Sequence, residues 1–285
     1  MGPKIWINNC LVDQAEAKVS VFDHALLYGD GVFEGIRVYG GRIFECKAHL
    51  DRLYESAKVI MLKIPMEMEG LTRAMEDTVA ANGIREGYIR LIVTRGIGDL
   101  GLNPFLCKKA QIIIIADQIQ LYPEELYDKG IKVISVSSVR NHPLTCPPQV
   151  KSLNYLNNVL AKIEAVQAGA DEGIMYNHLG YVAEATGDNV FIVKNGIVYT
   201  PPIQAGSLGG ITRRVVIRLA KQENINVVET DLTRFDLYVA DEMFLTGTAA
   251  EVIGVAEMDG RTIGSGNPGP ITLRLRKKFF EYAHS

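Results

Sequence analysis

Apolar and polar positions in the first part of the chain change their spacing near residue 47. Before it, short apolar runs are broken by turn residues, and Gly40-Gly41 between Gly35–Tyr39 and Arg42–Cys46 is typical of a two-residue hairpin. After it, apolar positions recur at helical spacing, which predicts an amphipathic helix. The stripe of this helix consists of Leu50, Leu53, Ala57 and Ile60.

Helix and strand patterns continue up to residue 116. A second helix is expected over Met68–Asn82 and ends at Gly83, because glycine commonly follows the last residue of a helix. Two apolar strands, Tyr88–Thr94 and Ala110–Ala116, are separated by a loop that contains glycine, aspartate and proline. These elements predict a small N-terminal α/β domain over residues 1–116.

The periodic pattern is lost between Asp117 and Pro123, where turn residues accumulate. A chain of 285 residues exceeds what one hydrophobic core usually serves, so two domains are expected. We place an inter-domain loop at residues 117–125 and a large C-terminal domain at residues 126–285. The fold class is α+β, or mixed α/β, because the regular strand–helix alternation of a doubly wound sheet or TIM barrel is missing.

The larger domain begins with a strand, Ile131–Val136, and a proline-rich loop, Asn141–Pro148. A strong helix is expected to begin near Ser152–Asn154. Its apolar stripe consists of Leu153, Leu156, Leu160 and Ile163. The later helices are expected at Ile211–Lys221 and Ile271–Tyr282, and the later strands at Glu172–Asn177, Tyr181–Ala183, Asn189–Lys194, Ile197–Thr200, Asp241–Thr246 and Val252–Glu257.

The charge and composition of the chain argue against two classes of partner. The formal net charge of −3 and the isoelectric point of about 6.0 do not suit a general nucleic-acid binder, whose phosphate contacts need a basic face. The longest purely apolar run, Ile112–Ala116, is too short to cross a bilayer, and the N-terminus resembles a strand instead of a signal peptide. We therefore expect neither a nucleic-acid nor a membrane partner.

The spacing of cysteines and histidines predicts no metal site and no disulfide framework. The four cysteines (Cys10, Cys46, Cys107 and Cys146) are scattered and are expected to be buried, reduced thiols, which predicts a cytoplasmic protein. The sequence also lacks the motifs of dinucleotide-binding, P-loop, serine-hydrolase and zinc-protease sites.

Three segments carry residues suited to chemistry. Lys151 precedes a predicted helix N-terminus, where the helix dipole favours the neutral amine that a Schiff-base lysine needs, although an exposed loop lysine explains the same pattern. Ser207–Thr212 would present unpaired backbone N–H groups to a phosphate, although many helices begin with glycines. Glu184, among small neighbours between two strands, is either a buried carboxylate with a partner or an ordinary turn residue.

Together with other blocks, these segments form a familiar series. In chain order the blocks are Asp23–Gly35, His49–Leu53, Tyr88–Arg90, Lys151–Tyr155, Glu184–Asn189, Leu208–Thr212 and Gly247–Ala249. The series resembles the fold-type IV pyridoxal-phosphate enzymes and, within them, the branched-chain amino-acid aminotransferases. The resemblance implies a two-domain, D-amino-acid aminotransferase-like architecture, with a C-terminal domain that binds pyridoxal 5′-phosphate as cofactor.

The resemblance implies roles for residues around this cofactor. Lys151 matches the lysine that binds the cofactor aldehyde and then moves the proton between the substrate Cα and C4′. Glu184 matches the carboxylate that faces the pyridine nitrogen and keeps it protonated. Arg52 matches the phosphate-binding arginine, although an ion pair with Glu55 on the helix surface explains it as well. The other implied cofactor contacts are the Tyr155 hydroxyl with O3′, Leu208 with the ring face, and the amides of Ile211 and Thr212 and the hydroxyl of Thr248 with the phosphate.

The resemblance also implies a substrate pocket and a second subunit. Arg90 matches an arginine at the rim of an apolar pocket, where it takes the distal carboxylate of glutamate. The backbone amides of Thr248 and Ala249 would hold the α-carboxylate. The apolar pocket positions are matched by Phe33, Tyr88 and Ala250, and positions lent by a neighbouring subunit of a homodimer are matched by Tyr28, Leu100 and Leu102.

The expected reaction is a ping-pong transamination from L-leucine, L-isoleucine or L-valine to 2-oxoglutarate. One block departs from the pattern, because Lys151–Tyr155 is one residue shorter than the Lys-x-Gly-Gly-Asn-Tyr of some bacterial branched-chain enzymes. Its Lys-Ser-Leu-Asn form also occurs in relatives that act on D-amino acids. A D-amino-acid or (R)-amine transaminase, or an aminodeoxychorismate-lyase-like enzyme, is therefore the alternative; a non-catalytic protein on this fold would be expected to lack Lys151 or Glu184.

Overall fold

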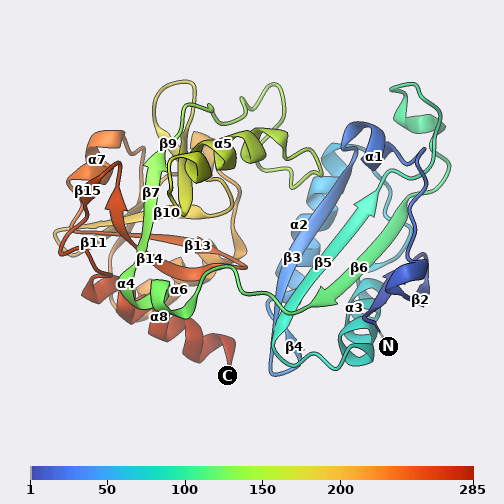
Figure 1. The fold of residues 1–285 in the computed structure, drawn as a ribbon, viewed down its shortest axis with the longest axis horizontal. Helices are drawn as coiled ribbons and strands as arrows, with labels where there is room; N and C mark the ends of the chain where they lie inside the picture. The colour runs from blue at the N-terminus through green and yellow to red at the C-terminus, as the bar shows by residue number, and fades with distance from the viewer. Residues whose placement is uncertain (1) are drawn as a thin grey trace. The chain divides into compact units, whose positions relative to one another are not determined.

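The structure is a computed structural model that describes residues 2–285, and the chain divides into two compact units. The first unit contains the residues up to Ile119 together with Val150–Tyr155, and the second contains Gln120–Gln149 and Leu156–Ser285. Each unit is built on its own β-sheet with helices against it (Figure 1). The expected α+β, or mixed α/β, fold class is confirmed.

The return of Val150–Tyr155 to the first unit differs from the expected boundaries. The chain leaves the first unit after Ile119, within the predicted loop of residues 117–125, but Val150–Tyr155 was expected in the C-terminal domain. Backbone pairing explains the difference. The Phe33 N–H donates to the Lys151 carbonyl at 3.0 Å, and the Leu153 N–H donates to the Gly31 carbonyl at 2.9 Å.

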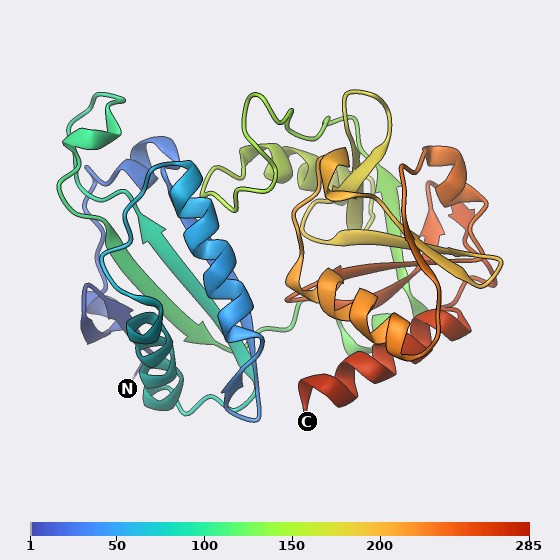
Figure 2. The same cartoon turned by 180° about the vertical axis from the view of Figure 1, so that it is seen from behind.

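The sheet of the first unit is antiparallel, with strand order β2-β1-β6-β5-β3-β4. In chain order its strands are β1 (Lys4–Ile7), β2 (Cys10–Asp13), β3 (Gly31–Tyr39), β4 (Arg42–Ile43), β5 (Gly87–Thr94) and β6 (Gln111–Asp117). A short helix, α1 (His24–Tyr28), precedes β3. Helices α2 (Cys46–Val59) and α3 (Met68–Ala81) cover one face of the sheet, as Figures 1 and 2 show from opposite sides.

The two faces of this sheet differ because side chains alternate along a strand. On the face covered by helices, Val32 and Ile36 of β3 pack with Leu50 and Leu53 of α2. The predicted stripe of α2 is confirmed for Leu50, Leu53 and Ala57, whereas Ile60 follows the last residue of the helix and is half-buried. The opposite face carries Phe33 of β3 and Tyr88 and Arg90 of β5.

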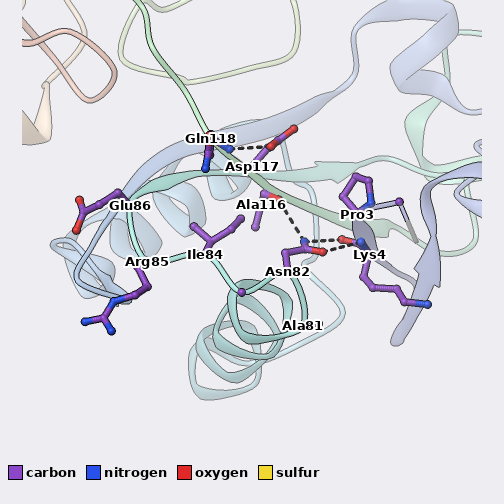
Figure 3. A pocket seen from close by; sticks show the side chains of 12 residues that line it. Pro3, Lys4, Ala81, Asn82, Ile84, Arg85, Glu86, Ala116, Asp117 and Gln118 are labelled. Atoms are coloured by element: carbon purple, nitrogen blue, oxygen red, sulfur yellow. Dashed lines mark hydrogen bonds between the residues drawn. The ribbon is translucent and has the colours of Figure 1, made fainter.

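A cavity of about 680 Å³ in the first unit lies between β1, the end of α3 and the end of β6 (Figure 3). The Asn82 side chain accepts a hydrogen bond from the Lys4 N–H at 2.6 Å and donates to the carbonyls of Lys4 at 2.8 Å and Ala116 at 3.2 Å. Asn82 therefore joins three elements through backbone groups. None of the residues selected from the sequence lines this cavity.

The sheet of the second unit is mixed, with order β12-β11-β10-β13-β14-β7-β8-β9, and β15 pairs with β14. In chain order its strands are β7 (Ile131–Ser135), β8 (Glu172–Tyr176), β9 (Val182–Ala185), β10 (Asn189–Lys194), β11 (Ile197–Thr200), β12 (Val227–Glu229), β13 (Glu242–Gly247), β14 (Glu251–Met258) and β15 (Arg261–Thr262). Strand β7 is parallel to β8 and β14, and β11 is parallel to β12. The interior contains mainly aliphatic side chains, such as Ile131, Ile174 and Val255.

The helices of the second unit are α4 (Glu124–Lys129), α5 (Leu156–Gln167), α6 (Ile211–Gln222), α7 (Arg234–Tyr238) and α8 (Pro270–Ala283). Helix α5 contacts β8, and α6 lies beside α8 (Figure 2). The short elements α1, α4, α7, β12 and β15 were not predicted, because so few residues carry no clear periodicity. No helix in residues 2–285 has the length and hydrophobicity needed to cross a membrane.

The prediction for α5 was wrong in its start and in its buried face. The helix begins at Leu156, after Tyr155, and its buried residues are Asn158, Ala161 and Ala165. In the expected stripe, Leu156, Leu160 and Ile163 are exposed and Leu153 lies before the helix. The reason lies at Gly173 of β8, where an added Cβ would be only 3.4 Å from the Ala161 carbonyl and from the Ala165 Cβ. Such close contact selects small side chains.

The cysteines also differ from the expectation of burial. Cys10 is exposed, and Cys46, Cys107 and Cys146 are half-buried. All four are free thiols. Burial raises the pKa of the Cys46 and Cys107 thiols, which keeps both in their less reactive, protonated form near neutral pH.

Candidate active site

Lys151 lies in an extended segment that pairs with β3 of the first unit. Ser152 forms a β-bridge with Val32, and the Lys151 N–H donates to Ser56 Oγ of α2 at 3.2 Å. Because α5 begins only at Leu156, Lys151 lies outside the first turn of the helix. The prediction that a helix dipole favours its neutral amine is therefore wrong, since that effect fades beyond the terminal turn.

Aromatic side chains surround the Lys151 amine. Its Nζ donates to the Tyr155 hydroxyl at 3.2 Å and lies 4.5 Å from the centre of the Phe33 ring. The rings of Phe33 and Tyr155 meet edge to face, with their centres 5.1 Å apart. The carbon at the centre of the Arg90 guanidinium lies 4.6 Å from the Phe33 ring centre and 5.7 Å from that of Tyr88. The first unit thus brings Lys151, Tyr155, Phe33, Tyr88 and Arg90 together.

Gly35 makes room for one of these rings. It pairs with Arg90 across β3 and β5, and a Cβ at this position would overlap the hydroxyl of Tyr88. The Tyr88 ring therefore lies over the backbone of β3, where any larger residue would displace it. The position of Tyr88 thus depends on a glycine in the neighbouring strand.

Arg52 is held in a buried cluster between α2 and β3. Its Nε and Nη2 donate to the two carboxylate oxygens of Glu34 at 2.8 and 2.7 Å. His49 Nδ1 donates to Glu34 Oε2 at 2.7 Å, because an ionised carboxylate can only accept. Arg52 is therefore paired with Glu34 of the neighbouring strand, and not with Glu55 on the helix surface as the alternative interpretation held.

The charges of this cluster follow from burial and pairing. Burial alone would raise the pKa of the Glu34 carboxyl, but the Arg52 guanidinium and the hydrogen bond from His49 lower it from 4.5 to about 2. Burial lowers the pKa of His49, against the opposing effect of Glu34, and favours a neutral ring. Glu34 is therefore an anion and Arg52 its countercharge.

In the second unit, Glu184 of β9 is buried and forms an ion pair with Arg140. Arg140 Nε and Nη2 lie 2.8 and 2.7 Å from Glu184 Oε1. The same guanidinium donates to Asn158 Oδ1 of α5 at 3.2 Å, and Asn158 donates to the Thr186 carbonyl at 2.8 Å. Glu184 is thus a buried, paired carboxylate, and the interpretation of it as a turn residue is wrong.

The other oxygen of Glu184 orients the segment before α6. The Leu208 N–H donates to Glu184 Oε2 at 2.8 Å, and Asn189 Nδ2 donates to the Leu208 carbonyl at 2.9 Å. Helix α6 then begins at Ile211, followed by Thr212, after a Gly210 that offers no side-chain cap. The first amide groups of a helix have no partners within the helix, so this terminus suits an anion.

The turn between β13 and β14 carries the last of the sequence-selected residues. Thr248 and Ala249 are half-buried, whereas Ala250 is completely buried in the hydrophobic interior of the second unit. Gly247 is required at the start of the turn, because a Cβ there would overlap the Asp188 carboxylate. Ala250 therefore belongs to the hydrophobic core beneath the turn, whereas Thr248 and Ala249 lie partly at the surface.

The positions expected to serve a neighbouring subunit are exposed in this chain. The Tyr28 hydroxyl donates to the Leu100 carbonyl and so ties α1 to the loop after β5. The side chains of Leu100 and Leu102 are 69% and 77% exposed. These residues are thus available to a partner.

Sequence reasoning missed the partners of the charged residues. Arg140 was not singled out, and Glu34 and His49 were noted only within blocks. A signal was present for Glu34, because its side chain falls on the inward, apolar side of β3 between Val32 and Ile36. Arg140 lies in an irregular segment, whose side-chain direction no periodicity predicts.

The chain matches the model of a known protein family. Residues 31–258 match the family model of the class IV amino-transferases. This range is most of the chain, and it includes every residue selected from the sequence except Tyr28. The protein therefore belongs to the class IV aminotransferases, which share fold type IV.

Individual relatives narrow this class. The branched-chain-amino-acid aminotransferase of Pseudomonas aeruginosa is 41% identical over 282 residues, 97% of this chain and 92% of its own. A protein of Methanocaldococcus jannaschii is 54% identical over 277 residues, 97% of this chain and 95% of its own. The crystal structure of the Escherichia coli branched-chain amino acid aminotransferase has a TM-score of 0.96 at 38% identity and covers 99% of this chain and 94% of that one. Within the class, the chain belongs to the family of the branched-chain-amino-acid aminotransferases.

Proposed function

We propose that the protein is a branched-chain-amino-acid aminotransferase that uses pyridoxal 5′-phosphate. It moves the amino group of L-leucine, L-isoleucine or L-valine to 2-oxoglutarate in a ping-pong reaction. The observation that carries the proposal is the group formed by Lys151, Tyr155, Phe33 and Arg90, in which an amine and a guanidinium lie against the same aromatic ring. Membership of the branched-chain family supports it.

The donor and acceptor groups of the chain fit the parts of this cofactor. A lysine amine suits its aldehyde, a phenol its ring hydroxyl, and a guanidinium and helix amides its phosphate. Among residues 2–285, three of the buried polar side-chain atoms without a hydrogen-bond partner lie close in sequence to the selected residues: His49 Nε2 in the first unit, and Ser207 Oγ and Thr246 Oγ1 in the second. Such atoms are rare in folded proteins and are consistent with a polar ligand.

In the first unit, Lys151 is assigned the proton transfer. When bound, the cofactor supplies an electron sink for the charge left at the substrate Cα. With the cofactor bound, the Lys151 amine would act as the base and acid that carries a proton between the substrate Cα and C4′. Tyr155 holds this amine by a hydrogen bond and is assigned to the cofactor O3′. Arg52 is assigned to the phosphate.

In the second unit, Glu184 is assigned to the pyridine nitrogen. The carboxylate would keep that nitrogen protonated, and the bonds from Arg140 stabilise the buried carboxylate as an anion. Leu208, fixed by its N–H to Glu184, is assigned to the ring face. The phosphate is assigned to the amides of Ile211 and Thr212 and the hydroxyl of Thr248, and the substrate α-carboxylate to the amides of Thr248 and Ala249.

The substrate pocket must accept both an aliphatic and an anionic side chain. Phe33 and Tyr88 offer apolar surface, and Arg90, which lies against both rings, offers a cation for the distal carboxylate of glutamate. Ala250 is included in the proposal as the buried support of the pocket-lining turn. This combination favours 2-oxoglutarate and branched-chain amino acids as the substrate pair.

The proposal includes a homodimer in which Tyr28, Leu100 and Leu102 serve the neighbouring subunit. Their exposure supports it, because large contiguous apolar surfaces on monomers are uncommon. Helix α5 carries a second apolar stripe, which suits further assembly of dimers; its exposed residues are Leu156, Val159, Leu160, Ile163 and Val166. The four free thiols support a cytoplasmic location. We assign residues 1–116 and 126–285 to small and large domains joined by residues 117–125, with Val150–Tyr155 returning to the small domain.

The function is tested by the visible absorbance of the purified protein before and after separate additions of L-leucine, D-alanine and (R)-1-phenylethylamine. We expect the visible absorbance band of the lysine-bound cofactor to disappear after addition of L-leucine only. The Lys151→Ala variant should lack this band from the start. In a separate assay of turnover with each 2-oxo acid, Arg90→Ala should impair the reaction of 2-oxoglutarate much more than that of 2-oxoisocaproate. Loss of the band mainly with D-alanine or the amine would retain the cofactor but reject the substrate, and equal loss with both oxo acids would reject the role of Arg90.

A further inference from the structure

Glu34 is an ionised carboxylate in a position where the fold alone calls for an apolar side chain. It is completely buried on the helix-facing side of β3, between Val32 and Ile36. Replacing a buried ion pair by apolar residues is often neutral or stabilising, so stability alone does not explain this carboxylate. The groups that Glu34 contacts point to a functional role for its charge.

The contacts of Glu34 fix the direction of one guanidinium. Its two oxygens accept from Arg52 Nε at 2.8 Å and Nη2 at 2.7 Å, a bidentate geometry that sets the plane of the guanidinium as well as its distance. Oε2 also accepts from His49 Nδ1 at 2.7 Å. Because His49 and Arg52 lie three residues apart on α2, one carboxylate orients two side chains of the same helix.

The cluster lies between the two elements that hold Lys151. The Nε2 atom of His49 is buried and is without a hydrogen-bond partner among residues 2–285. The backbone of Lys151 contacts the same strand and the same helix, because its carbonyl accepts from the Phe33 N–H of β3 at 3.0 Å and its N–H donates to Ser56 Oγ of α2 at 3.2 Å. The Glu34–His49–Arg52 cluster therefore joins the two elements that also hold Lys151.

We propose that Glu34 is a positioning residue for the cofactor phosphate: it holds the Arg52 guanidinium in the orientation in which Arg52 binds that group. The inference rests on the phosphate role of Arg52 in the proposed function. Two effects of the carboxylate oppose each other. Its charge repels a phosphate, whereas its bidentate bonds prevent the long arginine side chain from sampling other rotamers. The positioning effect dominates, because a buried arginine without its carboxylate loses both its geometry and its countercharge.

The test compares the affinities of the full-length protein for pyridoxal 5′-phosphate and for pyridoxal, which lacks the phosphate. The dissociation constant of pyridoxal divided by that of pyridoxal 5′-phosphate measures the contribution of the phosphate, independently of turnover. Glu34→Gln should lower this ratio at least ~10-fold and leave the dissociation constant of pyridoxal almost unchanged, as expected for loss of a charge-assisted orienting contact. Glu34→Asp, which keeps the charge but shortens the side chain, should lower the ratio as well.

Matched controls separate positioning from general damage. Glu172→Gln removes another buried, ion-paired carboxylate, bonded to Thr186 and Lys162 in the second unit, and should leave the ratio unchanged even if it lowers stability. Arg52→Gln should lower the ratio at least as far as Glu34→Gln, and the double variant should be no worse than Arg52→Gln alone. Thermal unfolding followed by circular dichroism establishes that each variant is folded.

The outcomes are distinct. An unchanged ratio in Glu34→Asp and Glu34→Gln overturns the inference and leaves the proposed function intact. A raised ratio in Glu34→Gln also overturns it, because charge repulsion would then dominate. If Arg52→Gln leaves the ratio unchanged, the phosphate role of Arg52 fails and the inference falls with it. If Glu34→Gln does not fold, the ratio in Glu34→Asp alone decides.

Discussion

Two carboxylates, one in each unit, are buried as ions among the residues assigned to the site. Glu34 and Glu184 are both ion-paired with an arginine, and each is held by a second group, His49 in one case and the Leu208 amide in the other. The partners are far apart in the sequence, so the chain between them must fold before either pair exists. Sequence patterns therefore identified Arg52 and Glu184 without their partners.

The stability of the protein should fall in acid through Glu34. The pKa of its carboxyl is about 2 in the folded protein and 4.5 in the unfolded chain, so its contribution is complete above pH 4.5 and is lost as the pH falls towards 2. The shift corresponds to about 3 kcal/mol of unfolding free energy. His49 acts in the same direction, because its lowered pKa makes protonation below its ordinary value of 6.5 favour the unfolded chain.

The measurement is urea unfolding of the wild type and Glu34→Gln at several pH values between 7 and 3. The difference in unfolding free energy between the two proteins should be largest near pH 7 and shrink below about pH 4.5, because there the unfolded wild-type chain takes up a proton on Glu34 while the folded protein keeps the carboxylate ionised. A difference that stays constant over this range would show that the Glu34 charge does not contribute in the manner described.

At the scale of elements, periodicity predicted the positions of most helices and strands, but for one helix it predicted the wrong buried face. The strands β10 and β11 and the helix α6 agree closely with the apolar patterns, because the core face of each element is apolar. Helix α5 is the exception. Its larger apolar residues are exposed, and its small residues pack against β8 at Gly173. Which face is buried depends on the neighbouring strand, which the pattern of a single helix does not contain.

Gly210→Ala should disturb the N-terminus of α6. The added Cβ would overlap Asn189 Oδ1, and Asn189 holds the Leu208 carbonyl. We expect the affinity for pyridoxal 5′-phosphate to fall, because the clash moves the segment that presents the first amides of α6, and the free energy of unfolding to fall by ~1–3 kcal/mol, the usual cost of overpacking. The control is Gly209→Ala, where the Cβ would meet only Ile203 Cδ1 at an ordinary 3.4 Å.

Both variants are measured by titration with the cofactor, followed by its absorbance. Equal affinities for the two variants would mean that the entry to α6 does not require the arrangement around Asn189. A loss in Gly209→Ala alone would contradict the packing argument directly.

At the scale of the whole molecule, the chain exposes many large apolar side chains and carries a net charge of only −3. Repulsion between copies of so weakly charged a protein does little to prevent their association. A weakly charged protein with exposed leucines on α5 and in the loop after β5 is expected to associate. Such association would bring Tyr28, Leu100 and Leu102 to the neighbouring subunit, which is the role proposed for them above.

Leu102→Glu should weaken the dimer. Sedimentation equilibrium of the wild type should give a mass of at least twice 31.4 kDa, whereas the variant should shift towards the monomer as its concentration falls. Leu179→Glu is the control, because Leu179 is 67% exposed but is not among the residues assigned to the interface. A monomeric wild type would reject the homodimer, and dissociation by both variants would reject the role of Leu102 in particular.

The sequence by itself determined the elements with strong periodicity, the mixed α/β class and the ordered blocks that place the chain among fold-type IV enzymes. These properties are local, because each depends on the spacing of residues within one segment or on the order of segments. Only the tertiary structure decided the return of Val150–Tyr155 to β3, the pairing of Glu34 with Arg52 and His49, the pairing of Glu184 with Arg140, and the buried face of α5. Each of these depends on a contact between distant segments, and the energy that selects it, a desolvated charge or a close backbone approach, exists only after those segments have met.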